Sequence, residues 1–149
     1  MRSDDAARLP VRPLHSPGDV VAATGGHPVA VLDVGDGDRP RGFAVGGADG
    51  TDEADAVVVS RGSDHGVPGV AVLGDGAAYE ALLTHDTVRE WLAGNGFRHV
   101  SAPRQRFGVL RAHLALDPQR GGDWDWMWTD TPPPPVPAEE RVVTLRADA

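Results

Sequence analysis

The segment from Ala56 to Thr84 constrains the fold most, because two strand signals and one helix signal follow each other closely. Two short runs, AVVVS at 56–60 and GVAVL at 69–73, are rich in β-branched residues and flank the turn-rich sequence SDHGVPG. Such runs predict neighbouring β-strands. The second run leads through Gly74-Asp75-Gly76 into a helical sequence, so we expect a helix over 76–84 with Asp75 as its cap.

The remaining elements are expected to be short, because 19 Gly and 13 Pro interrupt the chain. Ser16-Pro17-Gly18-Asp19 predicts the start of a helix that Gly25-Gly26 would end. Thr87 and Glu90 have the spacing of a capping box, and the helix they open would place Val88, Trp91 and Leu92 on one face. Further strands are predicted at 29–34, 42–45, 97–103 and 107–116. The pattern indicates an α+β fold, with a mostly antiparallel sheet and two or three short helices.

The chain divides into three regions in this interpretation. Residues 1–15 form a loose, charged lead-in, and residues 16–131 form the α+β domain. Residues 132–149 form a Pro-rich arm, in which PPPPVP is extended polyproline II and RVVTLR at 141–146 is a terminal strand. That strand would either add to the preceding sheet or open a further domain.

Charge and composition exclude several classes of function. The formal net charge is −8, which argues against binding duplex nucleic acid or an anionic membrane surface. The chain has neither Lys nor Cys, so it offers no Schiff-base lysine, thiol nucleophile, disulfide or thiolate metal site. No apolar run reaches the length of a membrane span, and the N-terminus lacks the apolar core of a signal peptide. We therefore expect a cytoplasmic protein.

The turn at Gly74-Asp75-Gly76 is a weak candidate for an anion site. A helix N-terminus after a strand can hold a phosphate through its backbone N–H groups. Asp75, however, places a negative charge in that position, and Tyr79 stands where a dinucleotide-binding fingerprint requires Gly. An ordinary capped turn is the better interpretation.

Other groups of polar residues predict no chemistry. The cluster of Ser60, Ser63, Asp64 and His65 resembles the parts of a serine triad, but neighbours this close in sequence favour a hydrogen-bonded turn. The six His are scattered without metal-ligand spacing, and a metal held between His99 and His113 is not favoured. The acidic residues Asp33, Asp36 and Asp38 lack the rest of a calcium loop.

The sequence DWDWMWTDT at 123–131 holds three of the four tryptophans. If it is extended, Trp124, Trp126 and Trp128 lie on one side, and Asp123, Asp125, Met127 and Thr129 lie on the other. Stacking on nucleobases is disfavoured because the flanking charges are acidic. We interpret the three tryptophans as an apolar anchor, which either closes the core of this domain or forms its interface with another.

The strand–GD–helix sequence, and above all DWDWMWTDTPPPP followed by a strand, resembles the N-terminal, non-catalytic half of actinobacterial N-acetyltransferases of the GNAT superfamily. The resemblance covers most of residues 15–145. It implies that a complete enzyme transfers acetyl groups from acetyl-CoA to an amine, and that a catalytic GNAT domain is the partner, in cis or in trans.

The resemblance transfers no catalytic or cofactor-binding residue to this chain. The superfamily holds the pyrophosphate of acetyl-CoA on a [QR]-x-x-G-x-[GA] loop at a helix start. The two partial matches, beginning at Arg41 and Arg61, both lack the middle Gly. The chain by itself is thus expected to bind no cofactor and to serve docking of the catalytic domain or the substrate entrance. A stand-alone binding or scaffolding domain, a homo-oligomer, and direct acetyl-CoA binding at Gly74–Gly76 are the alternatives.

Overall fold

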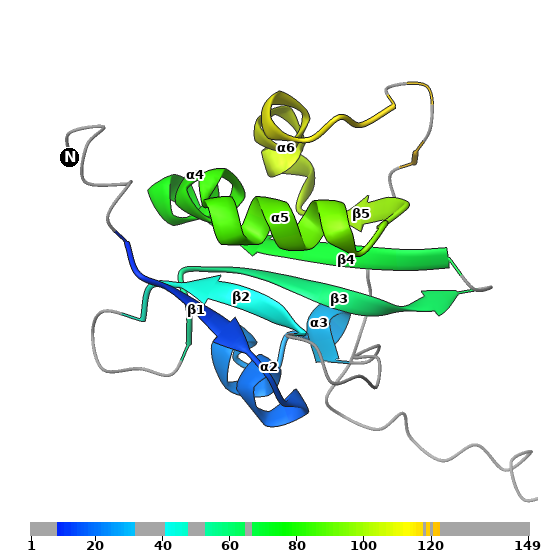
Figure 1. The fold of residues 1–149 in the computed structure, drawn as a ribbon. Coiled ribbons are helices and arrows are strands. Elements are labelled where there is room, and N and C mark those ends of the chain that lie inside the picture. Colours follow the sequence, from blue (N-terminus) through cyan, green and yellow to red (C-terminus); the bar gives the residue numbers. More distant parts are fainter. Residues whose placement is uncertain are drawn as a thin grey trace, which may run out of the picture.

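The computed structural model describes residues 9–31, 41–47, 53–64, 67–117, 119 and 121–122. Within them, five strands form one sheet whose spatial order follows the chain (Figure 1). The strands are β1 (Val11–Leu14), β2 (Gly42–Val45), β3 (Ala56–Asp64), β4 (Val67–Gly74) and β5 (His99–Ser101). The first three pairings are antiparallel, and β4 pairs with β5 in parallel. The predicted α+β class with a mostly antiparallel sheet is confirmed at this level.

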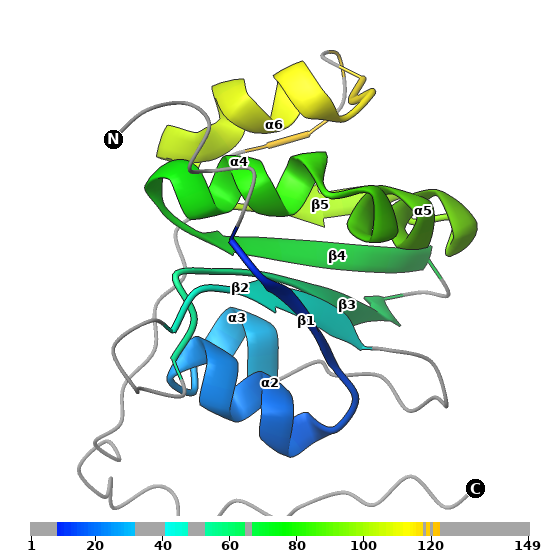
Figure 2. The same cartoon turned by 60° about the vertical axis from the view of Figure 1, so that its left-hand side comes forward.

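Helices cover both faces of the sheet, as Figure 2 shows. They are α2 (Pro17–Thr24), α3 (Pro28–Val31), α4 (Gly76–Thr84), α5 (Asp86–Gly94), the 3₁₀ turn η1 (Arg104–Arg106) and α6 (Phe107–His113). Helices α2 and α3 lie on one face, whereas α4, α5 and α6 lie on the other. The described helices outnumber the two or three that the sequence predicts.

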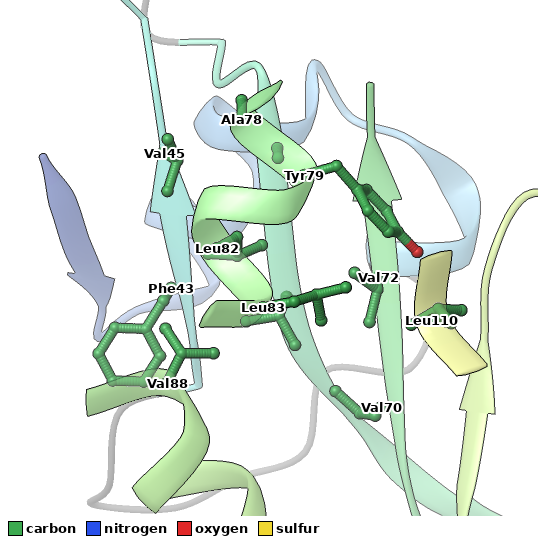
Figure 3. Close-up of a cluster of buried hydrophobic side chains, with 12 residues drawn as sticks. Phe43, Val45, Val70, Val72, Ala78, Tyr79, Leu82, Leu83, Val88 and Leu110 are labelled. Carbon is green, nitrogen blue, oxygen red and sulfur yellow. The ribbon is translucent and has the colours of Figure 1, made fainter. Parts of the chain in front are cut away.

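The alternation of side chains along the strands creates two cores, one on each face. The large core lies under α4, α5 and α6, and Figure 3 shows its centre. It includes Phe43, Val45, Val58, Val70, Val72, Tyr79, Leu82, Leu83, Val88 and Leu110. The small core lies against α2 and α3 and consists of Leu14, Val20, Ala23, Val29, Ala30, Ala44, Val57, Val59 and Ala71. Strand β2 and the segments 56–59 of β3 and 69–72 of β4 are therefore buried on both sides, which explains their near-continuous apolar sequence.

Helix α2 begins and ends where the sequence predicts. The Ser16 hydroxyl accepts a hydrogen bond from the N–H of Asp19, and the Asp19 carboxylate accepts from the N–H of Ser16, which completes a capping box. Pro17 occupies the first turn, where its missing N–H costs nothing. Gly25 closes the helix in the left-handed conformation, with φ 58°.

Two N-terminal predictions differ from the structure. The expected loose lead-in fails for Val11–Leu14, which form β1 and pair with β2. The strand prediction over 29–34 is wrong for residues 29–31, because Pro28–Val31 form α3, and residues 32–34 lie outside the described part. A proline at the first position presets a helical φ, and Val29 and Ala30 can enter the small core from one short turn. These local effects outweigh the β-propensity of valine.

The strand predicted over 107–116 is also wrong, because Phe107–His113 form α6. Alternation and helical periodicity are hard to separate in short apolar sequences. The helix buries Leu110 and leaves Phe107 46% exposed. In an alternating strand, Leu110 would lie on the face opposite to Phe107 and Val109. Burial of one stripe against α4 decides the outcome.

Helix α5 exists as predicted, but its start differs. It begins at Asp86, the preceding His85 makes no side-chain cap, and Thr87 lies inside the helix, so the predicted capping box is wrong. Its apolar face is as expected: Val88 is buried and Trp91 packs on the large core. The Trp91 ring lies 5.6 Å from that of Phe43 and 5.0 Å from that of Phe97.

Candidate functional site

The junction between β4 and α4 is the candidate site that the sequence singled out. Strand β4 ends at Gly74 and helix α4 begins at Gly76, with φ angles of 117° and 54°. A Cβ at Gly74 would overlap the backbone of Asp55 and Ala56, so the close approach of β3 requires glycine there. The N–H of Asp75 donates to the carbonyl of Asp55 at 3.2 Å, which fixes the turn on the end of β3.

Asp75 caps α4, as predicted. Its carboxylate accepts a hydrogen bond from the N–H of Gly76 and forms an ion pair with Arg106 of η1. The positive end of the helix and an arginine thus both face the chain's own carboxylate. An external anion would have to displace Asp75 to reach these donors.

Sequence reasoning missed Arg106, because η1 lies in a segment that was expected to link two strands. The signal that could have found it is the basic triplet Arg104-Gln105-Arg106 after Pro103. The Asp75 side chain is 80% exposed, and ion pairs at such exposed positions contribute at most about 1 kcal/mol to stability. Its importance is therefore its position at the helix N-terminus rather than its strength.

Tyr79 is the buried polar group nearest to this junction on α4. The side chain is 1% exposed, and its hydroxyl has no hydrogen-bond partner among the described residues. Figure 3 shows the ring beside Val72 of β4, with the hydroxyl directed toward Leu110 of α6 and away from the start of α4. Burial raises the pKa of the phenol above its ordinary value, so Tyr79 is neutral and offers no base.

A second polar group lies across β3, β4 and β5 on the small-core face. Arg61 donates from Nη1 to Oγ of Ser101 at 3.1 Å, and Ser101 is only 7% exposed. Arg61 is opposite Gly69, which is opposite His99. A Cβ at Gly69 would overlap the His99 ring, so the ring lies over Gly69 of β4, on the same face of the sheet as Arg61.

The remaining sequence candidates lie partly outside the described residues, and those inside them do not form a site. Arg41 directly precedes β2 and Arg61 lies within β3, so neither partial acetyl-CoA motif stands between a strand and a helix. Ser60 is half-buried in β3, while the side chains of Ser63 and Asp64 and all of His65 lie outside the described part. The structure therefore does not test the triad, because three of its four residues lack described side chains.

Within the described ranges, no group of three or more His, Asp or Glu side chains is placed to hold a metal ion. His99 lies in β5 and His113 at the end of α6. Asp33, Asp36 and Asp38 lie outside the described residues, as do Trp124, Trp126 and Trp128.

A search of the described helices for a membrane-spanning segment found none with the required length and apolar character. Comparisons of the chain with protein-family models, with curated proteins and with solved structures found no match.

Proposed function

We propose that this chain is a non-catalytic, GNAT-like domain of an N-acetyltransferase. In the complete enzyme, a catalytic GNAT domain transfers the acetyl group of acetyl-CoA to an amine. This chain holds that domain or shapes the entrance for the acceptor substrate. The cytoplasm is the expected location, because acetyl-CoA is made and used there.

The proposal rests on the sequence resemblance and on the coarse architecture. A mostly antiparallel sheet whose strand β4 leads through a glycine turn into a helix is the arrangement that the resemblance implies. The parallel pairing of β4 with β5 supports it further, because the α4–α5 connection then returns to the same sheet as a crossover.

One observation carries the non-catalytic part of the proposal: Asp75 occupies the start of α4 and is paired with Arg106. Backbone N–H groups at this position would have to meet the pyrophosphate of acetyl-CoA. A resident carboxylate repels that group and competes for the same donors. Neither a glutamine nor an arginine followed by the required glycines precedes α4.

Trp124, Trp126 and Trp128 are the proposed contact with the catalytic domain. They directly precede the polyproline arm, which would hold the next domain at a defined distance. Alanine scanning of interfaces finds tryptophan among the residues with the largest contributions, because a buried indole removes much apolar surface from water.

A stand-alone binding or scaffolding domain is the second candidate, and the burial pattern favours it. Both faces of the described sheet have a core with fully buried side chains, such as Leu14 and Leu82. A sheet with both faces covered can fold without a partner. In this case the tryptophans would close the domain's own core, or a homo-oligomer would cover them.

Thermal melting with acetyl-CoA tests the non-catalytic assignment. We expect 1 mM acetyl-CoA to leave the melting temperature of the chain unchanged, because a ligand that does not bind cannot stabilise. The Asp75→Asn variant is the matched control, since it removes the resident charge and keeps the side-chain volume. A rise of several degrees for the unaltered chain would contradict the proposal.

The link to acetyl transfer requires the protein from its source cells. Purification under native conditions, followed by intact-mass measurement, separates a chain of 15.7 kDa from a longer polypeptide. We expect acetyltransferase activity toward amines in the native preparation and none in the isolated chain. A native preparation that is homogeneous, carries no catalytic partner and lacks this activity would favour the scaffolding domain.

A further inference from the structure

The segment over residues 91–116 carries a charge opposite to that of the rest of the chain. The full chain has 14 basic residues against 22 acidic ones, yet this segment contains no acidic residue. It contains four arginines and two histidines, namely Arg98, His99, Arg104, Arg106, Arg111 and His113. The net negative charge of the protein therefore comes from the remainder of the chain, and the region of β5, η1 and α6 is locally basic.

Helix α6 is the outermost element on the large-core face, as Figure 1 and Figure 2 both show. Its inward side buries Leu110. Its outward side, continued into η1, carries Arg104, Phe107 and Arg111, and all three side chains are exposed. They share one side because residues three apart align in a 3₁₀ turn and residues four apart align in an α-helix. These three residues form a basic stripe with an aromatic side chain at its centre.

Phe107 distinguishes the basic stripe from an ordinary charged helix surface. Its side chain is 46% exposed, and among the described residues only Phe107 and Val21 are exposed large apolar residues. A single exposed apolar side chain has no meaning by itself. Here, however, one arginine precedes it and another follows it by one turn on the same side. Arginine and aromatic residues are enriched where proteins contact each other, so the combination favours a protein partner.

Gly108 lies beside the basic stripe, inside the continuous η1–α6 segment. Glycine in a helix costs stability relative to alanine. The described structure gives no reason for that cost, because Gly108 does not have a positive φ and a Cβ built on it would meet no described atom within 4 Å. A glycine in open space lets another backbone approach the helix closely. It therefore supports an external occupant on this side of α6.

We propose that the outward side of η1 and α6 binds a short acidic segment of a partner protein. Arg104 and Arg111 pair with two carboxylates, and Phe107 packs against an apolar side chain between them. The two arginines are separated by about 11 Å along the helix axis. An extended chain rises about 3.3 Å per residue, so the two carboxylates belong to residues three or four positions apart. This surface is separate from the tryptophans, and its role does not depend on acetyl transfer.

Charge complementarity selects a short segment rather than nucleic acid or a membrane. Both of these are anionic over lengths far greater than the basic stripe, so they would also meet the acidic parts of the chain. Exposed Glu80, Asp86 and Glu90 lie on α4 and α5, which cover the same face of the sheet as α6. Exposed charges act on each other over about 8 Å at physiological ionic strength. A segment of a few residues contacts the basic stripe without approaching these carboxylates.

Fluorescence anisotropy with the full chain tests the proposal. The probe is a short fluorescein-labelled peptide in which two leucines separate two aspartates and glycines form both ends. The control peptide has asparagines in place of the aspartates. We expect the aspartate probe to bind at low ionic strength and to bind about five-fold more weakly in 0.3 M salt, because salt screens exposed charges. The asparagine peptide should bind about ten-fold more weakly than the aspartate probe at low salt.

A matched pair of charge reversals locates the binding surface. Arg111→Glu changes the basic stripe, and Arg89→Glu makes the same change at an exposed position of α5. We expect Arg111→Glu to weaken binding of the aspartate probe by about ten-fold and Arg89→Glu by less than about two-fold, because screening limits the effect of distant charges. Equal losses in the two variants would mean that the probe senses only net charge, and they would overturn the proposal.

Gly108→Ala separates binding from folding. We expect this variant to melt about 3 °C higher than the natural chain, because alanine favours the helix. It should nevertheless bind the aspartate probe more weakly, because the added methyl group prevents close approach of the peptide backbone. Unchanged binding in this variant, or no binding to the natural chain, would overturn the proposal. Tighter binding of a single-stranded oligonucleotide or of anionic lipid vesicles than of the aspartate probe would also overturn it, and would assign the basic stripe to that ligand.

Discussion

The two faces of the sheet are built from side chains of different size. The large core combines leucines and a tyrosine of α4 and α6 with Phe43 of β2 and with valines of the strands. The small core is mostly alanine and valine, which lets α2 and α3 approach the sheet closely. Burial of apolar area scales with side-chain size, so the large-core face is expected to contribute more stability. The small-core face depends more on local backbone features, such as the cap of α2.

Matched truncations of leucine test this difference, and they carry the largest expected effect. Leu82 lies in the large core and Leu14 in the small core, and both are fully buried. We expect Leu82→Ala to lower the free energy of unfolding by about 4 kcal/mol and Leu14→Ala by about 2 kcal/mol. Leu14 lies on β1, at the edge of the described sheet, among small side chains that can move to close the cavity more easily. Chemical denaturation measures both. Equal losses would contradict the proposed asymmetry between the two faces.

The turn into the large-core helices gives the second comparison. Gly74 has a φ of 117° and no room for a Cβ, whereas Gly76 has a φ of 54° and open space around it. We expect Gly74→Ala to cost about 3 kcal/mol or more, from backbone strain and overlap with β3. Gly76→Ala should cost about 1 kcal/mol, from the left-handed conformation alone. Similar melting temperatures for the two variants would mean that β3 does not hold the turn closely.

Sequence patterns predicted most strongly the elements whose signal is local. The cap of α2, the strands β2, β3 and β4, and the helix over 76–84 follow from capping residues, β-branched runs and glycines. The failures at 29–34 and 107–116 are short apolar sequences in which packing on the sheet decides between strand and helix. No local signal fixes that choice.

The candidate site was predictable only in part, for the same reason. Asp75 was recognisable as a cap, because an acidic residue between a strand and a helix is a local pattern. Its partner Arg106 lies more than thirty residues away, and it reaches Asp75 only because β5 returns beside β4. The Arg61–Ser101 hydrogen bond has the same origin, since it joins β3 to β5 across β4.

The Tyr79 hydroxyl is a polar group inside the large core, and substitution of Tyr79 tests whether this hydroxyl contributes to stability. Its hydroxyl is buried without a hydrogen-bond partner among the described residues, and a buried unsatisfied group is unfavourable. We expect Tyr79→Phe to leave stability unchanged or to raise it by about 1 kcal/mol, measured by denaturation. Tyr79→Leu is the control for loss of the ring. A clear loss of stability in the phenylalanine variant would mean that the hydroxyl has a partner in the remainder of the chain.

The cap of α2 gives the smallest effect, and it should depend on pH. Hydrogen bonds from the backbone N–H groups of Ser16 and His15 lower the pKa of Asp19 below its ordinary value. A carboxyl group whose pKa is lower in the folded state stabilises the protein above its unfolded pKa, and this contribution is lost as the pH falls through the folded value. We therefore expect Asp19→Asn to be less stable than the natural chain at pH 7, with the difference shrinking below about pH 4.

Ser16→Ala is the matched control, because it removes the other half of the capping box without removing a titratable group. It should cost about 1 kcal/mol at pH 7, and a difference should persist in acid, since the hydroxyl does not titrate. Denaturation at pH 7 and pH 3 measures both variants. A pH-independent loss for Asp19→Asn would mean that the charge of Asp19 is unimportant, and that the cap stabilises the small-core face through geometry alone.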